Sequence, residues 1–256
     1  MFNIFGSTYD AVFFRQETAR LKKEFDKTGI LIFEDFLNEE AVAALQKEAA
    51  DLKTQAFRAE SIYNVYVLPA DPGFPTKSPR NRLLKSTKAC IPDDQLPADS
   101  LLRTLYDSKL FRAFLCEVLG IDALYPYADP LSSINVNYYD PGDALGWHFD
   151  NADFAITLLV KGCQKGGVYE YFTDMRYDEN GEENYDLVQQ CLDGEILPKR
   201  QSVEEGSLMI FRGNQSLHRV TDVEAGERIL VTLNFNTKPG VALSEQSRKT
   251  FFGRTQ

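Results

Sequence analysis

Apolar residues recur at spacings of three and four in three stretches of the N-terminal half, a pattern that predicts amphipathic helices. The stretches cover residues 12–28, 39–53 and 99–119. We expect Gly29 and Gly120 to end the first and last of these helices, and Asn38, which precedes two glutamates, to cap the second. Between the first two helices, the apolar run Ile30–Phe33 predicts a short strand.

Residues 54–100 interrupt the helical pattern. Five prolines between positions 69 and 92 break any periodicity in this region. The segment is too apolar for disorder, so we interpret it as a long functional loop with short strands. It carries Arg80 and Arg82 in the run Pro79–Arg82.

The pattern changes from residue 132 onward, where short apolar runs alternate with glycine-containing turns. Strands are predicted at residues 132–139, 153–160, 167–172, 207–212 and 229–236. Short strands at such spacing are typical of a β-sandwich or barrel. A polar insertion at 173–202 interrupts them, and Tyr185–Leu192 within it is expected to be a short helix.

These patterns predict a mainly β protein with an N-terminal helical layer, forming one catalytic domain over residues 1–256. Residues 1–125 would provide helical support and the substrate loop, and 126–240 the β-barrel core. The tail, 241–256, contains Phe251 and Phe252. Its pattern leaves open whether it covers a pocket or contacts a second copy of the chain.

Composition narrows the possible functions. The 256 residues carry a net charge of −10, which argues against nucleic-acid binding and against anionic lipid surfaces. No apolar run is long enough for a membrane span, and Met1–Asp10 lacks the features of a signal peptide. The four cysteines are scattered without a paired motif, so we expect reduced thiols in a cytoplasmic protein. Composition does not indicate an oligomeric state.

The chain has only two histidines, and both stand in a pattern that suits a metal. His148 and Asp150 are two residues apart, so on a strand both side chains point the same way. His218 follows a second predicted strand. Two imidazoles and a carboxylate form the facial triad of non-haem Fe(II) oxygenases, which leaves coordination positions open for other ligands. A lone histidine usually has a structural role, so the surrounding residues must support the hypothesis.

Several neighbouring residues do so. Arg228 begins a predicted strand, where a guanidinium can bind a carboxylate through two hydrogen bonds, although a surface arginine is also common there. Asn137 and Tyr139 share one face of the strand before His148 and offer uncharged donors; packing and turn roles are the alternatives. The pair Gly166–Gly167 opens the strand that ends in Tyr171 and Phe172, which by itself indicates only a turn.

Taken in order, these motifs resemble the Fe(II)/2-oxoglutarate-dependent dioxygenase superfamily over residues 132–240. The segment Thr28–Leu37 with its following helix is similar to the phytanoyl-CoA-hydroxylase-like branch and to standalone hydroxylases and halogenases of free amino acids. The resemblance implies a double-stranded β-helix, a jelly-roll barrel. It further implies that Fe(II) is bound by His148, Asp150 and His218. The cosubstrate 2-oxoglutarate would be held by Arg228, with help from Asn137 and Tyr139.

The resemblance also implies a reaction. Together with O₂, 2-oxoglutarate would be converted into succinate and CO₂ while an unactivated C–H bond of a small molecule is hydroxylated. Related halogenases replace the triad acid with a small residue so that chloride can bind iron. Asp150 is present here and favours oxygenation, although desaturation, cyclisation and epimerisation remain open.

The expected substrate is a free neutral amino acid or a similar small acid. Arg80 and Arg82 are candidates for its carboxylate, Asn234 for a polar group, and Trp147 for the pocket wall, although each has a plain structural alternative. Leu131 and Leu145 stand where lysine-acting relatives would be expected to carry acidic or imidazole groups, which argues against a basic amino acid. The alternatives are a protein or peptide hydroxylase on the same scaffold, or a jelly-roll binding module without turnover.

Overall fold

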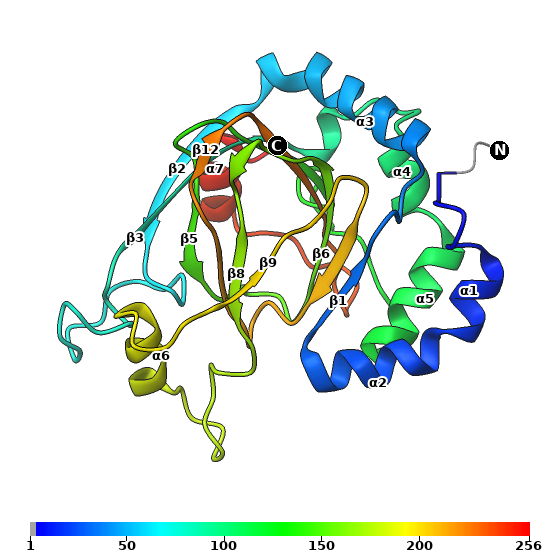
Figure 1. Cartoon of the computed structure of the whole chain (residues 1–256). Helices are drawn as coiled ribbons and strands as arrows, with labels where there is room; N and C mark the ends of the chain where they lie inside the picture. The colour runs from blue at the N-terminus through cyan, green and yellow to red at the C-terminus, as the bar shows by residue number, and fades with distance from the viewer. Residues whose placement is uncertain (1–3) are drawn as a thin grey trace.

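A computed structural model of the chain describes residues 4–256. Its helices gather mainly on one side of a β-barrel (Figure 1). In this described part they are α1 (Ala11–Gln16), α2 (Thr18–Thr28), α3 (Glu39–Leu52), α4 (Leu101–Tyr106), α5 (Lys109–Leu119), α6 (Tyr185–Leu192) and α7 (Glu245–Phe252). Asn38 caps α3 through its side chain, and Gly29 and Gly120 end α2 and α5 in the left-handed conformation, as the sequence predicts.

Two antiparallel sheets face each other to form the barrel. Over residues 4–256, the larger runs in the order β1 (Ile30–Phe33), β10 (Leu208–Phe211), β6 (Ala155–Lys161), β13 (Arg228–Leu233), β4 (Ile134–Tyr139), β3 (Leu84–Ile91), β2 (Phe57–Tyr63). The smaller runs β5 (Leu145–His148), β11 (Leu217–Val220), β8 (Tyr169–Phe172), β9 (Lys199–Gln201). A short pair, β7 (Lys165–Gly166) and β12 (Val223–Ala225), joins them at one end. The predicted jelly-roll architecture follows from this strand order.

The outer face of the larger sheet packs against the helices and forms the main hydrophobic core. Strands β4 and β13 contribute Ile134, Val136, Ile229 and Val231 to it, all nearly inaccessible to solvent. Helix α5 contributes Phe114, whose ring lies in contact with aromatic rings from α1 and β1. Because helices and barrel share this core, the helical layer supports the sheet from behind. The proposed division of the domain at residues 125 and 240 stays a prediction.

Two of the predicted helices are divided. The helix expected over 12–28 breaks at Glu17 into α1 and α2, and the helix expected over 99–119 breaks after Tyr106. In the second case Ser108 starts α5 by accepting a hydrogen bond from the backbone of Phe111, so a capping residue inside the apolar pattern begins a new helix. A periodic pattern alone does not reveal such a break.

The segment 54–100, which we interpret from sequence as a long loop with short strands, contains more regular structure than predicted. Strands β2 and β3 pair with each other, and β3 pairs with β4, so this segment extends the larger sheet. Only residues 64–83, which contain most of the prolines, form the loop between them. The last strand, predicted at 229–236, is shorter in the structure, where β13 ends at Leu233.

Helix α7 packs on the strands of its own chain. Phe252 is buried in a cluster with Cys90 of β3 and Leu131, and Gly253 lies against the ring of Phe57 on β2. Arg254 forms a bidentate ion pair with Asp94. The C-terminal tail therefore covers the end of the larger sheet where β2 and β3 lie.

Two further expectations concern membranes and thiols. Within residues 4–256, no helix has both the length and the apolar character needed to cross a bilayer. Residues 1–3 of the stretch in which we expect no signal peptide lie outside the described part. Each of the four cysteines has a free thiol. The cytoplasmic location stays a prediction.

Candidate metal centre

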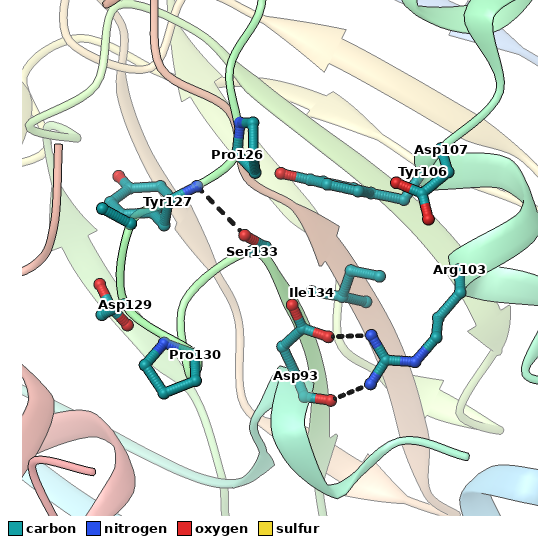
Figure 2. A pocket seen from close by; sticks show the side chains of 11 residues that line it. Asp93, Arg103, Tyr106, Asp107, Pro126, Tyr127, Asp129, Pro130, Ser133 and Ile134 are labelled. Carbon is teal, nitrogen blue, oxygen red and sulfur yellow. Dashed lines mark hydrogen bonds and ion pairs between the residues drawn. The ribbon is translucent and has the colours of Figure 1, made fainter. Parts of the chain in front are cut away.

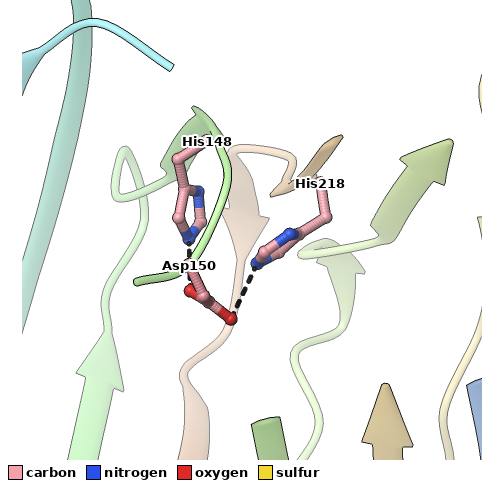
Figure 3. A group of neighbouring side chains, drawn as sticks. All are labelled: His148, Asp150 and His218. Carbon is pink, nitrogen blue, oxygen red and sulfur yellow. Dashed lines mark ion pairs between the residues drawn. The ribbon is translucent and has the colours of Figure 1, made fainter. Parts of the chain in front are cut away.

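The smaller sheet brings the two histidines together. His148 at the end of β5 pairs directly with His218 on β11 in the backbone register, and their rings lie 4.2 Å apart. Asp150 follows β5 and faces both of them (Figure 3). Its carboxylate oxygens lie 3.4 Å from Nε2 of His148 and 3.7 Å from Nε2 of His218. The three ligand atoms lie within 4.8 Å of one another, which suits one metal ion.

Backbone carbonyls fix the orientation of both imidazoles. Nδ1 of His148 bonds to the carbonyl of Gly146 at 2.8 Å, and Nδ1 of His218 bonds to the carbonyl of Ser216 at 2.8 Å. A carbonyl only accepts, so each Nδ1 must donate its proton. The lone pair of each Nε2 is then free and directed toward Asp150, as a metal ligand requires.

Asp150 is held in place by Gly213, in the turn after β10. The backbone N–H of Asp150 donates to the Gly213 carbonyl at 2.9 Å. A Cβ atom built on Gly213 would come 2.0 Å from Oδ2 of Asp150. The carboxylate therefore packs on bare backbone, and any side chain at position 213 would displace it.

The electrostatics of the triad favour the metal-binding protonation states. Burial, together with the neighbouring His148, lowers the pKa of His218 to about 4. Burial raises the pKa of Asp150, but His218, His148 and Lys88 outweigh this effect and keep the pKa below its ordinary value. At neutral pH the site therefore offers a neutral imidazole and an ionised carboxylate, the forms that coordinate metal ions.

Arg228 is buried in the barrel without an acidic partner in the described part of the chain. It starts β13 opposite Tyr139 of β4, and its guanidinium carbon lies 5.5 Å from the centre of the Tyr139 ring. Its Nη1 is buried and has no hydrogen-bond partner in residues 4–256. Gly167 lies directly beside this side chain, since a Cβ there would meet Cδ of Arg228 at 3.1 Å. The glycine pair therefore makes room for the arginine in addition to forming a turn.

A second cation in the interior, Lys88 on β3, escaped the sequence analysis. Its Nζ donates to Oδ1 of Asn137 at 2.7 Å. The amide nitrogen of Asn137 donates to the carbonyls of Leu230 and Asn135, so the whole Asn137 side chain is engaged. Lys88 was missed because β3 was interpreted as irregular. Lys88 lies two residues before Cys90, which pairs with Asn137, so Lys88 and Cys90 share the inward face of β3.

The candidate substrate residues make contacts with other parts of the chain. Arg82 pairs with Asp193 at 2.6 Å, and Arg80 donates to the carbonyl of Pro69. Trp147 precedes an inward-pointing histidine and packs in a separate cluster, with Arg219 4.7 Å from its ring centre. None of these contacts involves the triad.

Asn234, which follows β13, bonds mainly to other parts of its own sheet. Its Nδ2 donates to the carbonyl of Ser132 and to Oδ1 of Asn135. The roles assigned to these four residues in substrate binding stay predictions.

A surface cavity of about 350 Å³ is separate from the triad. Asp93, Arg103, Asp107 and Asp129 line it with a turn at residues 126–130 (Figure 2). Arg103 bonds to both the carboxylate and the backbone carbonyl of Asp93, so its charge is already compensated. The convergent, electrostatically perturbed groups lie in the barrel, and we place the functional centre there.

Solved structures of other proteins share this fold. An oxidoreductase of the 2OG-Fe(II) oxygenase family from Burkholderia pseudomallei matches with a TM-score of 0.56 and 12% identity, covering 89% of this chain and 94% of the other. A prolyl hydroxylase from Trichoplax adhaerens, in complex with a hypoxia inducible factor peptide fragment, matches with a TM-score of 0.58 and 12% identity. The match covers 90% of this chain and 93% of the other. The carbocyclase SnoK from nogalamycin biosynthesis matches with a TM-score of 0.58 and 14% identity, covering 95% of this chain and 94% of the other. The predicted double-stranded β-helix is confirmed.

The sequence itself identifies the family. The halogenase D family model matches residues 13–251, so this chain belongs to the halogenase D family. No curated protein matches the sequence. Family and fold together confirm the expected oxygenase superfamily and the assignment of the chain as an enzyme.

Proposed function

We propose that this chain is an Fe(II)- and 2-oxoglutarate-dependent oxygenase that hydroxylates a small organic acid. The observation that carries the proposal is the convergence of His148, Asp150 and His218, with Arg228 buried in the same barrel. The triad provides one facial set of metal ligands, whose donor atoms match those of non-haem iron sites.

The residues beside the triad fit the cosubstrate. A buried guanidinium without an anion is costly, and burial lowers the pKa of Arg228. The distal carboxylate of 2-oxoglutarate would supply the missing anion through charge-assisted hydrogen bonds, with the Tyr139 ring beside the guanidinium. Tyr169 on β8 offers a further donor, because its hydroxyl is buried and has no partner in the described residues.

When bound, Fe(II) and 2-oxoglutarate supply an oxidant derived from O₂ that attacks an unactivated C–H bond, with release of succinate and CO₂. The protein contributes position and environment. His148 and His218 hold the metal with orientations set by backbone carbonyls. Arg228 aligns the cosubstrate from β13, and the apolar rings of Phe211 and Tyr169 beside His218 limit access of bulk water.

Asp150 favours oxygenation over the halogenation that the family name suggests. A halide ion needs a free position on the metal, and here the Asp150 carboxylate, which lies beside both histidines, would occupy it. We therefore expect hydroxylation of the substrate. Asp150→Gly should open this position to chloride, although chlorinated product also depends on how the substrate is aimed.

The proposed substrate is a small molecule, a free neutral amino acid or a similar acid, and the proposed location is the cytoplasm. A peptide substrate is the main alternative, in which case the net charge of −10 would favour basic peptides. Succinate release measured across a panel of free amino acids and of peptides separates these two substrate classes.

Two substitutions test the site. Asp150→Ala and Arg228→Ala should each reduce substrate-driven succinate formation by at least about 100-fold, because one removes a metal ligand and the other the charged anchor for 2-oxoglutarate. Arg20→Ala on α2, which breaks exposed ion pairs with Glu17 and Glu24, serves as the control and should leave turnover unchanged. Near-wild-type turnover in both site variants would refute the assignment.

A further inference from the structure

Two cations lie inside the barrel without a carboxylate partner, and the proposed function uses only one of them. Within the described residues, no carboxylate oxygen lies within 4.0 Å of the side-chain nitrogens of Arg228 or Lys88. Some lysines nearer the surface are paired, for example Lys53 with Asp140. A cation in a protein interior is stabilised by an anion, so Lys88 requires an explanation of its own.

Lys88 and Arg228 lie on opposite sides of β4. Arg228 is on β13, which pairs with one edge of β4, whereas Lys88 is on β3, which pairs with the other. In the proposed function, 2-oxoglutarate binds Arg228 with one carboxylate and the metal with its other end. Both charged ends of the cosubstrate are then occupied, and Lys88 remains available to a third anionic group.

The Lys88 side chain lies beside Asn137, and the residue as a whole is half-buried, which leaves part of the side chain accessible. Its charge contributes to the low pKa of Asp150, so the two groups act on each other electrostatically. An ammonium group has three donors, and only one of them, to Asn137, is used in residues 4–256.

The surroundings of Lys88 are otherwise apolar. The ring of Phe251 from α7 lies with its centre 6.0 Å from Nζ. Phe251 packs in turn against the cluster formed by Cys90, Leu131 and Phe252. A ligand that contacts both Lys88 and this wall would therefore combine one anionic group with an aliphatic body.

We propose that Lys88 binds the carboxylate of the substrate, while Phe251 contacts its aliphatic part. This inference rests on the proposed function and narrows its substrate class to small aliphatic acids, free neutral amino acids included. Asn137 acts as a positioning residue, because it holds the ammonium group in place through Oδ1.

The test compares acids with their amides. The wild-type protein is loaded with Fe(II) and 2-oxoglutarate under argon, and the visible charge-transfer band is followed during titration. The probes are valine, leucine, isoleucine and the straight-chain acids from butyric to octanoic, each beside its primary amide. We expect at least one acid to shift the band and to bind at least about tenfold more tightly than its amide.

Lys88→Met should remove this preference, and Lys88→Arg should retain most of it, while both keep the 2-oxoglutarate affinity of the wild type. Lys85→Met is the matched control, because Lys85 is on the same strand but exposed and paired with Glu60. If Lys88→Met does not fold, the acid–amide comparison in the wild type and in Lys88→Arg still decides.

Several results would overturn the inference. They are equal binding of acids and amides, no response to any acid, full acid affinity in Lys88→Met, or loss of 2-oxoglutarate binding in that variant. Absence of the charge-transfer band in the wild type is a different result, because it would contradict the proposed function itself.

Discussion

The two faces of the larger sheet come from the same strands but have opposite character. On β13, Ile229 and Val231 point toward the helices and join the hydrophobic core, whereas Arg228 lies on the inward face. On β4, Val136 points outward and Asn137 inward. Each strand therefore serves stability with one set of alternate residues and chemistry with the other.

This comparison shows where polar residues carry functional information. The outward set is replaceable by other apolar residues of similar volume, because it contributes mainly buried area. The inward set includes a buried arginine, and it faces the smaller sheet, where the imidazole of His218 has a pKa far below its ordinary value. Groups of this kind are costly to bury, so their presence on one face indicates a site.

A substitution in the helical layer should separate the two faces most clearly. Phe114→Ala removes a nearly inaccessible ring that packs against Phe14 and Phe33. We expect the free energy of unfolding to fall by about 3–5 kcal/mol, measured by urea denaturation. The Fe(II) affinity of the folded protein should stay unchanged. A large loss of affinity would mean that the two faces are not independent.

A substitution near the triad should do the reverse. Gly213→Ala adds one methyl group where Asp150 Oδ2 now lies, so the carboxylate must move. We expect a loss of about 10–100-fold in Fe(II) affinity, measured by calorimetry under argon, although no ligand is removed. Gly162→Ala is the control, since the atoms nearest to a Cβ at that position lie at 3.8 Å, an ordinary contact. Unchanged affinity in Gly213→Ala would contradict the described packing.

The low pKa of His218 should have the smallest effect, which is on the pH dependence of stability. Its folded-state pKa of about 4 lies below the ordinary value of 6.5, so the unfolded chain takes up a proton first as the pH falls. The metal-free protein should therefore lose stability from about pH 6.5 down to about pH 4, by about 2 kcal/mol through this group at pH 4.5.

His218→Gln should show a correspondingly smaller loss over the same pH range. Denaturation curves of both proteins at pH 6.5 and pH 4.5 provide the comparison, in which other titrating groups cancel. Equal losses in the two proteins would show that burial does not depress the pKa of this imidazole.

Much of the barrel could be predicted from sequence, because its strands are apolar and separated by glycine turns. The triad could also be predicted, since few histidines and one HxD spacing limited the choices. Strand β3 could not, because its sequence, Leu84–Ile91, mixes lysine, serine and threonine with small residues and lacks clear alternation. The inward position of Lys88 follows only from this strand, so it could not be predicted either. The sequence favours Arg82 instead, whose charge Asp193 already compensates. The spacing of residues along the chain does not predict which side chains that are distant in sequence form ion pairs.

The pairing of His148 with His218 across the β5–β11 ladder has a consequence for metal loading. Both imidazoles are oriented by main-chain carbonyls, so the fold itself sets the direction of both Nε2 atoms. We therefore expect iron binding to require little reorientation of the two rings. The ion should raise the melting temperature only by mass action, in proportion to the logarithm of its free concentration.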